Sequence, residues 1–236
     1  MRQTEGVNGV VVAIDGPAGA GKSTIAKALA DDLGIEYLDT GAMYRGVTYE
    51  VLKRGLEATD VDAVGRVARE VQLSQTRTTL HVNGDDATSA IRTPAIDAAV
   101  SHVAANSAVR EELRTRQRDW IASHGGGVVE GRDIGSVVFP DATLKVYLVA
   151  SPMVRAQRRV AQHGGDVDEI ARAIAERDER DSTRADSPLR KMPDAVVVDT
   201  SNRSVREVIN EIRSLLSSRG VALGGPGVVG SPAVSS

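Results

Sequence analysis

A glycine-rich segment near the amino terminus has the residue types and the spacing to bind phosphate. The spacing of Gly16, Gly21, Lys22 and Ser23 fits the phosphate-binding loop pattern in full. Glycines let the backbone curl so that successive N–H groups cradle an anion, and the following helix adds its positive dipole end. Lys22 can then reach the β- and γ-phosphates, and the Ser23 hydroxyl can ligate Mg²⁺. The predicted nucleoside triphosphate site comprises Gly16, Pro17, Ala18, Gly19, Ala20, Gly21, Lys22, Ser23 and Thr24.

Neighbouring residues argue against three other classes of protein that carry glycine-rich loops. A dinucleotide-binding loop needs a third glycine where this chain has Thr24. A GTPase needs a base-reading motif, and nothing in the chain resembles Asn-Lys-x-Asp. A motor or remodelling ATPase usually carries an acidic strand end, whereas the strand expected at 144–149 runs into Ala150 and Ser151. A small-molecule kinase is therefore the favoured class.

Three further polar segments, 39–45, 130–133 and 177–184, carry arginines that could meet an anionic acceptor. A hydroxyl acceptor needs a base to remove its proton, but the oxygen of a nucleoside monophosphate is already anionic at neutral pH. Arginines are then needed to offset the repulsion between donor and acceptor phosphates. The chain has only four histidines, and this arginine-rich pattern favours transfer to a monophosphate.

The segment from 155 to 190 contains eight arginines and is broken by Gly164 and Gly165. One interpretation is a solvated pair of helices with internal ion pairs, which accounts for most of these arginines. The other is a mobile lid whose few inward arginines meet phosphates on closure, and this is the interpretation we favour. Closure would exclude water and suppress wasteful ATP hydrolysis.

The expected elements alternate between buried strands and helices. A strand at 10–14 precedes the loop, and a helix from Lys22 to Leu33 follows it, closed by Gly34. Further strands are expected at 35–38, 127–129, 144–149 and 195–199. Asn83-Gly84 predicts a hairpin in an inserted lobe. The pattern predicts an α/β fold with a parallel sheet flanked by helices.

Composition limits the alternatives. Hydrophobic residues make up 41% of the 236 residues but aromatics only 3%, so aliphatic side chains must fill the core. The net charge of −3 argues against a general polyanion binder, and the absence of cysteine excludes disulfides. No apolar run approaches the length of a membrane helix, and the first residues lack a signal-peptide pattern. We expect a cytoplasmic monomer without nucleic-acid or membrane partners, with a flexible amino terminus at 1–9 and a disordered tail at 220–236.

Four motifs in order make the chain similar to the bacterial cytidylate kinases, a family of nucleoside monophosphate kinases. They lie at 14–23, 38–45, 130–141 and 176–184, and the likeness runs from about 10 to 219. The resemblance implies ATP-dependent phosphorylation of CMP and dCMP with Mg²⁺, on a P-loop NTPase core with an inserted monophosphate-binding lobe and a helical lid. The expected division of the single kinase domain is a core at about 10–40, 126–155 and 193–219, an insert at about 41–125 and a lid at about 156–190.

The resemblance also implies roles for individual residues. The charge-stabilising catalytic residues would be Lys22, Arg132 and Arg184. The acceptor phosphate would be held by Arg45, Arg132 and Arg184. The cytosine would be surrounded by Thr40, Ser101, Arg110 and Asp133, and the sugar would meet Arg177 and Asp181. Arg158 and Arg159 would lie in the lid near the donor, and for Tyr44 packing and ligand contact are both open.

The chemistry of the base agrees with part of this assignment. Cytosine presents an N4 amino donor beside two ring acceptors, so Asp133 can accept from N4 while Arg110 donates to the ring. Uracil has a carbonyl at that place and would face Asp133 unfavourably, which can support large discrimination. Thr40 and Ala18 stand where some relatives carry serine. The alternatives that remain are a kinase for another monophosphate, such as UMP or AMP, and a non-catalytic nucleotide-sensing or nucleic-acid-binding ATPase.

Overall fold

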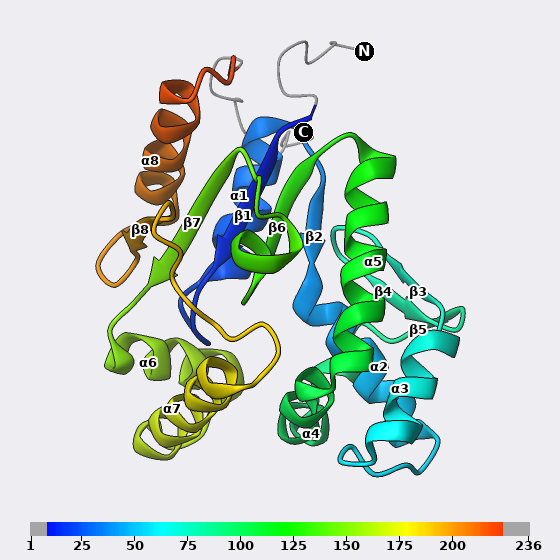
Figure 1. Ribbon diagram of the computed structural model, residues 1–236. Coiled ribbons are helices and arrows are strands. Elements are labelled where there is room, and N and C mark those ends of the chain that lie inside the picture. The colour runs from blue at the N-terminus through cyan, green and yellow to red at the C-terminus, as the bar shows by residue number, and fades with distance from the viewer. Residues whose placement is uncertain (1–8, 224–236) are drawn as a thin grey trace, which may run out of the picture.

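A five-stranded parallel sheet forms the centre of the computed structural model, which describes residues 9–223 (Figure 1). The strands lie in the order β2 (Tyr37–Asp39), β6 (Gly127–Gly131), β1 (Val11–Asp15), β7 (Leu144–Val149) and β8 (Val196–Asp199). All four pairings are parallel, so the carboxyl ends of the strands lie along one edge of the sheet. The predicted strands are confirmed with shifts of one or two residues at their ends.

Eight α-helices and a second, smaller sheet complete the described part of the chain. The helices are α1 (Lys22–Leu33), α2 (Thr40–Lys53), α3 (Val61–Glu70), α4 (Pro94–Ala105), α5 (Ser107–His124), α6 (Pro152–His163), α7 (Val167–Thr183) and α8 (Val205–Ser218). The antiparallel sheet consists of β3 (Leu73–Gln75), β4 (Leu80–Val82) and β5 (Asp85–Asp86). Two short turns are a 3₁₀ turn (Ala90–Arg92) and a π-helical turn (Ile134–Val138).

Local sequence signals set several helix ends. Asn106 accepts hydrogen bonds from two N–H groups at the start of α5, and Ser151 caps α6 directly before a proline at the first helical position. Ser204 and Glu207 form a complete capping box at the start of α8. Gly34 ends α1 with a left-handed φ of 65°, as the sequence predicts.

The central sheet has one apolar core on each face. Val12 and Ile14 of β1 point to the face that α1 and α8 cover, while Ala13 points to the opposite face. That opposite face is packed by α2 and α5, whose residues include Val47 and Leu113. Both cores are almost entirely aliphatic, as expected from the scarcity of aromatic residues. The second core extends without interruption into the lobe formed by residues 41–125, so this lobe is an extension of the central domain.

The lobe carries the small antiparallel sheet at its outer side (Figure 1). Asn83 and Gly84 both have positive φ, 52° and 91°, which is the turn chemistry that favours a tight hairpin. A Cβ atom on Gly46 of α2 would lie 2.8 Å from a methyl group of Leu73 and 3.0 Å from one of Leu80. The absence of a side chain at Gly46 therefore lets the hairpin pack directly on α2.

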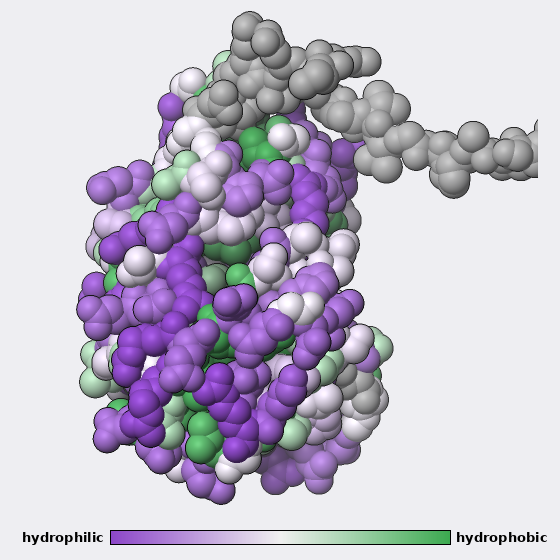
Figure 2. Space-filling view, turned by 90° about the vertical axis from the view of Figure 1, so that its right-hand side faces the viewer, coloured by the Kyte–Doolittle hydropathy of each residue, from purple (hydrophilic) through white to green (hydrophobic). Residues whose placement is uncertain are grey.

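The surface on the lobe's side of the molecule is mainly hydrophilic. Figure 2 views the molecule from the right-hand side of Figure 1 and shows hydrophobic residues there only in small, separated patches. Within the described part of the chain, no helix combines the length and the apolar character needed to cross a membrane.

The predicted start of the carboxyl-terminal tail is too early. Val221 is only 9% exposed and packs in the core beneath α8, and its N–H donates to the carbonyl of Leu216. Gly220 makes this turn possible with a φ of 81°. The Gly- and Ser-rich composition beyond 219 predicted disorder, so the turn that ends α8 was not expected. The rest of the predicted tail, 224–236, and the predicted flexible residues 1–8 lie outside the described residues.

Candidate functional site

The glycine-rich loop follows β1 and leads directly into α1, as the sequence predicts. Gly16, Gly19 and Gly21 have φ values of 151°, 75° and 87°, which side chains rarely permit. A Cβ on Gly16 would lie 2.2 Å from the carbonyl oxygen of Leu148 on β7. A Cβ on Gly19 would lie 3.0 Å from the Cβ of Arg155 on α6. Close approach of β7 and α6 therefore adds a second reason for glycine in this loop.

Lys22, the first residue of α1, is buried, and its Nζ donates to the Pro17 carbonyl at 2.8 Å. Burial, and next the nearby positive charge of Arg132, lower the pKa of Lys22. Its neighbour Ser23 donates from Oγ to Oε2 of Glu130 at 3.0 Å. The carboxylates of Glu130 and Asp15 offset part of this lowering.

Glu130 is a site residue that sequence reasoning missed. The search for an acidic strand end considered only the strand at 144–149, which is β7. The acidic residue is instead the last but one of β6, the neighbour of β1 on its other side. The Tyr37 hydroxyl donates to Glu130, and burial raises the pKa of this carboxyl. The available signal was its place in the polar segment 130–133, directly after a buried strand.

Asp15, the last residue of β1, positions the segment that follows β6. Its two carboxylate oxygens accept from the N–H groups of Ile134 and Gly135, each at 2.8 Å. Burial raises the pKa of Asp15 to about 6, against the lowering effect of these hydrogen bonds. This contact fixes the backbone next to Arg132 and Asp133.

Arg110 of α5 is fully buried and pairs with Asp133, with 2.5 Å between Nη2 and Oδ2. Its Nη1 donates to the carbonyl of Ala104, and its guanidinium carbon lies 5.4 Å from the centre of the Tyr44 ring. Arg184 approaches the other oxygen of Asp133 at 3.8 Å. Burial raises the pKa of Tyr44 to about 12. The structure thus brings four of the predicted acceptor-site residues into contact around Asp133.

Asp181 extends this group toward the loop. It accepts from Nε of Arg132 at 2.9 Å and lies 3.7 Å from Nη1 of Arg184. Burial would raise the pKa of Asp181, but the arginines around it hold that pKa below its usual range. We call Arg110, Arg132, Asp133, Asp181 and Arg184 the acceptor cluster. Within the described part of the chain, Nε of Arg110 and Nη2 of Arg184 are buried without a hydrogen-bond partner.

A second group of arginines meets Asp97 of α4, which sequence reasoning also missed. Arg45 of α2 and Arg159 of α6 contact its two carboxylate oxygens at 2.5 and 2.9 Å, and Arg177 of α7 lies 3.9 Å away. Arg159 was expected near the donor, yet its side chain reaches across to α4. Asp97 has no motif around it, so no signal in the sequence identified it.

Arg158 lies beside the glycine-rich loop. It donates to the side chain and the carbonyl of Thr200 at 3.0 and 2.6 Å, and the Thr200 hydroxyl donates to the carbonyl of Ala20. On the other side of the loop, Asp178 of α7 accepts from the N–H of Ala18 at 3.0 Å and pairs with Arg155. Arg155 in turn donates to the Ala18 carbonyl. Both α6 and α7 are thus attached to the loop.

Thr40 and Ser101, which were predicted to contact the cytosine, do not belong to the acceptor cluster. The Thr40 hydroxyl is buried and donates to the carbonyl of Glu130 at 2.7 Å, so it is already engaged with backbone. Ser101 is half-buried on α4 and makes no side-chain hydrogen bond to any described residue. Neither side chain lines the large cleft described next.

A cleft of about 990 Å³ connects the loop with the lobe. Its cationic lining residues are Lys22, Arg45, Arg92, Arg132, Arg158, Arg159, Arg177, Arg180 and Arg203. Its carboxylates are only Asp39, Asp97 and Glu130, and no histidine is among the described residues that line it. A strongly cationic cleft of this size suits two phosphate-bearing ligands, and a reaction that needs no histidine base.

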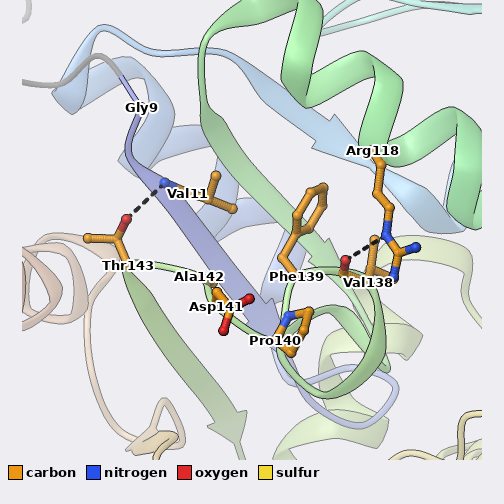
Figure 3. Close-up of a pocket in the computed structure, with 9 residues that line it drawn as sticks. All are labelled: Gly9, Val11, Arg118, Val138, Phe139, Pro140, Asp141, Ala142 and Thr143. Carbon is orange, nitrogen blue, oxygen red and sulfur yellow. Dashed lines mark hydrogen bonds between the residues drawn. The ribbon is translucent and has the colours of Figure 1, made fainter.

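A smaller cavity of about 370 Å³ lies at the opposite end of β1 (Figure 3). Arg118 on its wall already donates to the carbonyls of Val137 and Val138. Thr143 accepts from the N–H of Val11. Arg118 thus ties α5 to the π-helical turn, and Thr143 ties the start of β7 to β1. Because these polar groups already have structural partners, we assign the functional site to the large cleft.

Comparisons with known proteins agree with this geometry. The family model described as cytidylate kinase matches residues 12–218. A cytidylate kinase from Mycobacterium avium is 49% identical over 89% of this chain and 96% of its own length. One from Limosilactobacillus reuteri is 44% identical over 88% and 95%.

A solved structure of an uncharacterised protein from Eubacterium ventriosum covers 89% of the chain and 99% of its own length, with a TM-score of 0.52. It is only 12% identical and therefore supports the fold alone. The family match and the identities to the two cytidylate kinases lead to one conclusion. The chain belongs to the cytidylate kinase family.

Proposed function

We propose that this protein transfers the γ-phosphoryl group of ATP to CMP or dCMP, giving ADP and CDP or dCDP. The observation that carries the proposal is the cationic cleft that joins a formed phosphate loop to Arg132, the member of the acceptor cluster that lines it. The other four residues of the cluster are buried behind Arg132, which Asp181 contacts directly. Family membership supplies the acceptor base. In the division proposed here, 41–125 acts as the acceptor-binding insert and 156–190 as the lid, on a core of 10–40, 126–155 and 193–219.

The loop from Gly16 to Thr24 would hold the donor phosphates. Its N–H groups and Lys22 face the place where charge develops during transfer. Ser23 would hold Mg²⁺ with Glu130 beside it, because a hydroxyl and a carboxylate 3.0 Å apart are the hard oxygen ligands that this ion prefers. The ion would neutralise charge on the β- and γ-phosphates. Arg158 would meet the donor from the lid.

The acceptor phosphate would lie between the loop and the acceptor cluster. We assign it to Arg45, Arg132 and Arg184, with Lys22, Arg132 and Arg184 stabilising the transferred group. Nη2 of Arg184 and Nε of Arg177 are buried without a hydrogen-bond partner in the described chain, so each can donate to an incoming oxygen. The acceptor oxygen is itself anionic, so the residues need only position it and balance its charge.

The cytosine would bind at the Arg110–Asp133 pair. Asp133 would accept from N4 and Arg110 would donate to the ring acceptors, while Arg177 and Asp181 would meet the sugar. The two base-reading residues are paired with each other at present, so the base must enter between them or beside them. Tyr44 packs against Arg110 and would hold that guanidinium in its plane. Thr40 and Ser101 would close the pocket.

We further propose that the enzyme acts as a cytoplasmic monomer without nucleic-acid or membrane partners. The net charge of −3 gives no general attraction for polyanions, and the arginines of the cleft are grouped where two nucleotides would bind. Arg159 and Arg177 would close the lid over both substrates and exclude water.

The first test is an ADP-release assay with ATP and Mg²⁺ in which CMP, dCMP, UMP, AMP and dTMP are compared. We expect turnover with CMP and dCMP only. Turnover led by another monophosphate would retain the phosphate site and reject the cytosine assignment. Hydrolysis of ATP without any effect of a monophosphate would reject phosphoryl transfer to such an acceptor.

A further inference from the structure

Asp97 is an acidic side chain at the centre of an otherwise cationic part of the cleft. It lies in the first turn of α4, and its carboxylate contacts Arg45 of the lobe together with Arg159 and Arg177 of the lid helices. Its side chain is 30% exposed, so it faces the cleft. One carboxylate thus joins the two parts of the molecule that must enclose the acceptor.

The contact with Arg45 uses the same groups that a phosphate would need. Nη1 of Arg45 donates to the carbonyl of Ile91 at 3.0 Å, and Nη2 donates to Asp97 at 2.5 Å. A phosphate prefers two terminal nitrogens of a guanidinium. An acceptor phosphate that takes both terminal nitrogens of Arg45 would therefore compete with Asp97 for Nη2.

Asp181 provides a contrast within the same site. It contacts Arg132 through Nε, which leaves that guanidinium's Nη2 unengaged among the described residues. Asp181 can therefore hold the orientation of Arg132 while a phosphate binds to Nη2 of that guanidinium. Asp97 instead occupies the outer edge of Arg45. The two carboxylates differ in which part of the guanidinium they use.

Asp97 also carries the charge needed to imitate a phosphate. Partial burial raises its pKa, but Arg45, Arg159 and Arg177 together bring that pKa below its usual range. The side chain is therefore an anion at neutral pH, held by three cations in a region of reduced solvent screening.

We propose that Asp97 stands in for the acceptor's phosphate while the acceptor is absent, and competes with it for Arg45. Asp97 thereby sets the KM for the acceptor. It acts through Arg45 and is a positioning residue. This inference rests on the proposed role of Arg45 in holding the acceptor phosphate.

The test is the kinetics of Asp97→Asn, which keeps the size of the side chain and removes its charge. Loss of one competing charge-assisted hydrogen bond is expected to lower the KM for CMP about three- to tenfold. The KM for ATP is expected to change less than the KM for CMP, because Asp97 does not contact the donor loop and could affect the donor only through Arg159. Inorganic sulfate, used as a competitor of CMP, should inhibit the variant at correspondingly lower concentration.

Asp119→Asn is the matched control. Asp119 lies exposed on α5 of the same lobe and has no side-chain partner among the described residues, so it changes the net charge equally without touching Arg45. Asp97→Glu keeps the charge and should restore a KM close to that of the unchanged protein. A raised or unchanged KM in Asp97→Asn would overturn the proposal, since a carboxylate that only orients Arg45 would assist the acceptor.

A double variant tests this proposal separately from the assignment of Arg45 to the acceptor phosphate. In Arg45→Met, the further change Asp97→Asn should leave the KM for the acceptor unchanged, because the competed group is gone. If Asp97→Asn lowers the KM for the acceptor as much in the Arg45→Met variant as in the unchanged protein, competition at Arg45 is overturned. If the unchanged protein prefers another monophosphate, the cytosine assignment fails. The same KM measurements with that monophosphate then still test competition between Asp97 and the acceptor phosphate.

Discussion

The proposed donor loop and the proposed acceptor cluster are built by different means. The loop is nine consecutive residues that would bind phosphate mainly through backbone N–H groups. Its shape depends on the positive φ angles of its glycines and on close contact with β7 and α6. The cluster consists of side chains from α5, α7 and the segments that flank them, far apart in sequence. Its arginines are kept in place by Asp133 and Asp181.

This difference predicts which property of the protein a substitution in each site should change. A backbone cradle has little charge of its own, so the proposed donor site would depend on Lys22 and on the proposed Mg²⁺ for electrostatic stabilisation. A cluster of buried arginines has excess charge and depends on carboxylates for stability, because unpaired buried guanidinium groups are costly. Substitutions in the loop should therefore affect turnover, whereas substitutions of the cluster's carboxylates should affect stability and selectivity.

The largest effect is expected for Lys22→Ala. It removes the cation that faces the transferred phosphoryl group, and kcat should fall about a thousandfold, as when a main electrostatic group is removed from a transition state. The melting temperature should change little, because Nζ makes only one hydrogen bond, to Pro17. Lys191→Ala, at an exposed position, is the control for loss of one positive charge. Substantial residual turnover would contradict the role of Lys22.

Asp181→Asn should show the opposite pattern, with stability as the main loss. Removal of a buried partner of Arg132 and Arg184 is expected to lower the free energy of unfolding by about 3 kcal/mol at neutral pH. The pKa of Asp181 is lowered in the folded protein, so its stabilising contribution is present above the unfolded value of about 3.9 and is lost as pH falls through the folded pKa.

The gap in melting temperature between Asp181→Asn and the unchanged protein should therefore be widest near pH 7 and close as the pH falls below about 4. Calorimetry across that range measures it. A gap that is independent of pH would mean that packing, and not charge, accounts for the loss.

Asp133→Asn tests selectivity in the cluster. An amide can turn to donate where the carboxylate accepts, so the preference of kcat/KM for CMP over UMP should narrow about tenfold. Asp141→Asn makes the same change of charge at an exposed position and should leave the preference unaltered. An unchanged preference in Asp133→Asn would remove this residue from base recognition and leave it as a structural partner of Arg110.

The smallest effect is expected far from both sites. Truncation after Leu223 should leave activity and melting temperature unchanged, whereas truncation after Arg219 also removes Val221. Burial of one valine contributes about 1–2 kcal/mol, so the shorter protein should melt a few degrees lower with the same kcat. A change in kcat would show that the carboxyl terminus influences a site, against the separation described above.

The same contrast explains which parts of the molecule could be predicted from sequence. The loop was predictable because its residues are consecutive and its glycines are required by the local backbone conformation. Glu130 and Asp15 could not be placed, because their roles depend on β6 lying beside β1, which the order of strands along the chain does not reveal. Asp97 and Asp178 meet their partners only through the packing of α4 and α7. Asp97 has no motif around it, and the motif at 176–184 contains Asp178 but does not reveal that this residue contacts the loop. The tail boundary was missed because one valine among glycines gives no periodic pattern.

The attachment of Arg155 and Asp178 to Ala18 gives the lid the mechanics of a lever. This point lies near the start of α6, and the helix continues for about 12 Å beyond it to the turn at Gly164, at about 1.5 Å per residue. A rotation of about 10° about the attachment would move Arg159 by roughly 1 Å and the turn by roughly 2 Å. If α6 moves as part of the proposed lid, a rotation at this attachment would be amplified along the helix once Arg158 releases Thr200 and Arg159 releases Asp97. A spectroscopic label at the turn would then undergo the largest displacement and would report that movement most sensitively.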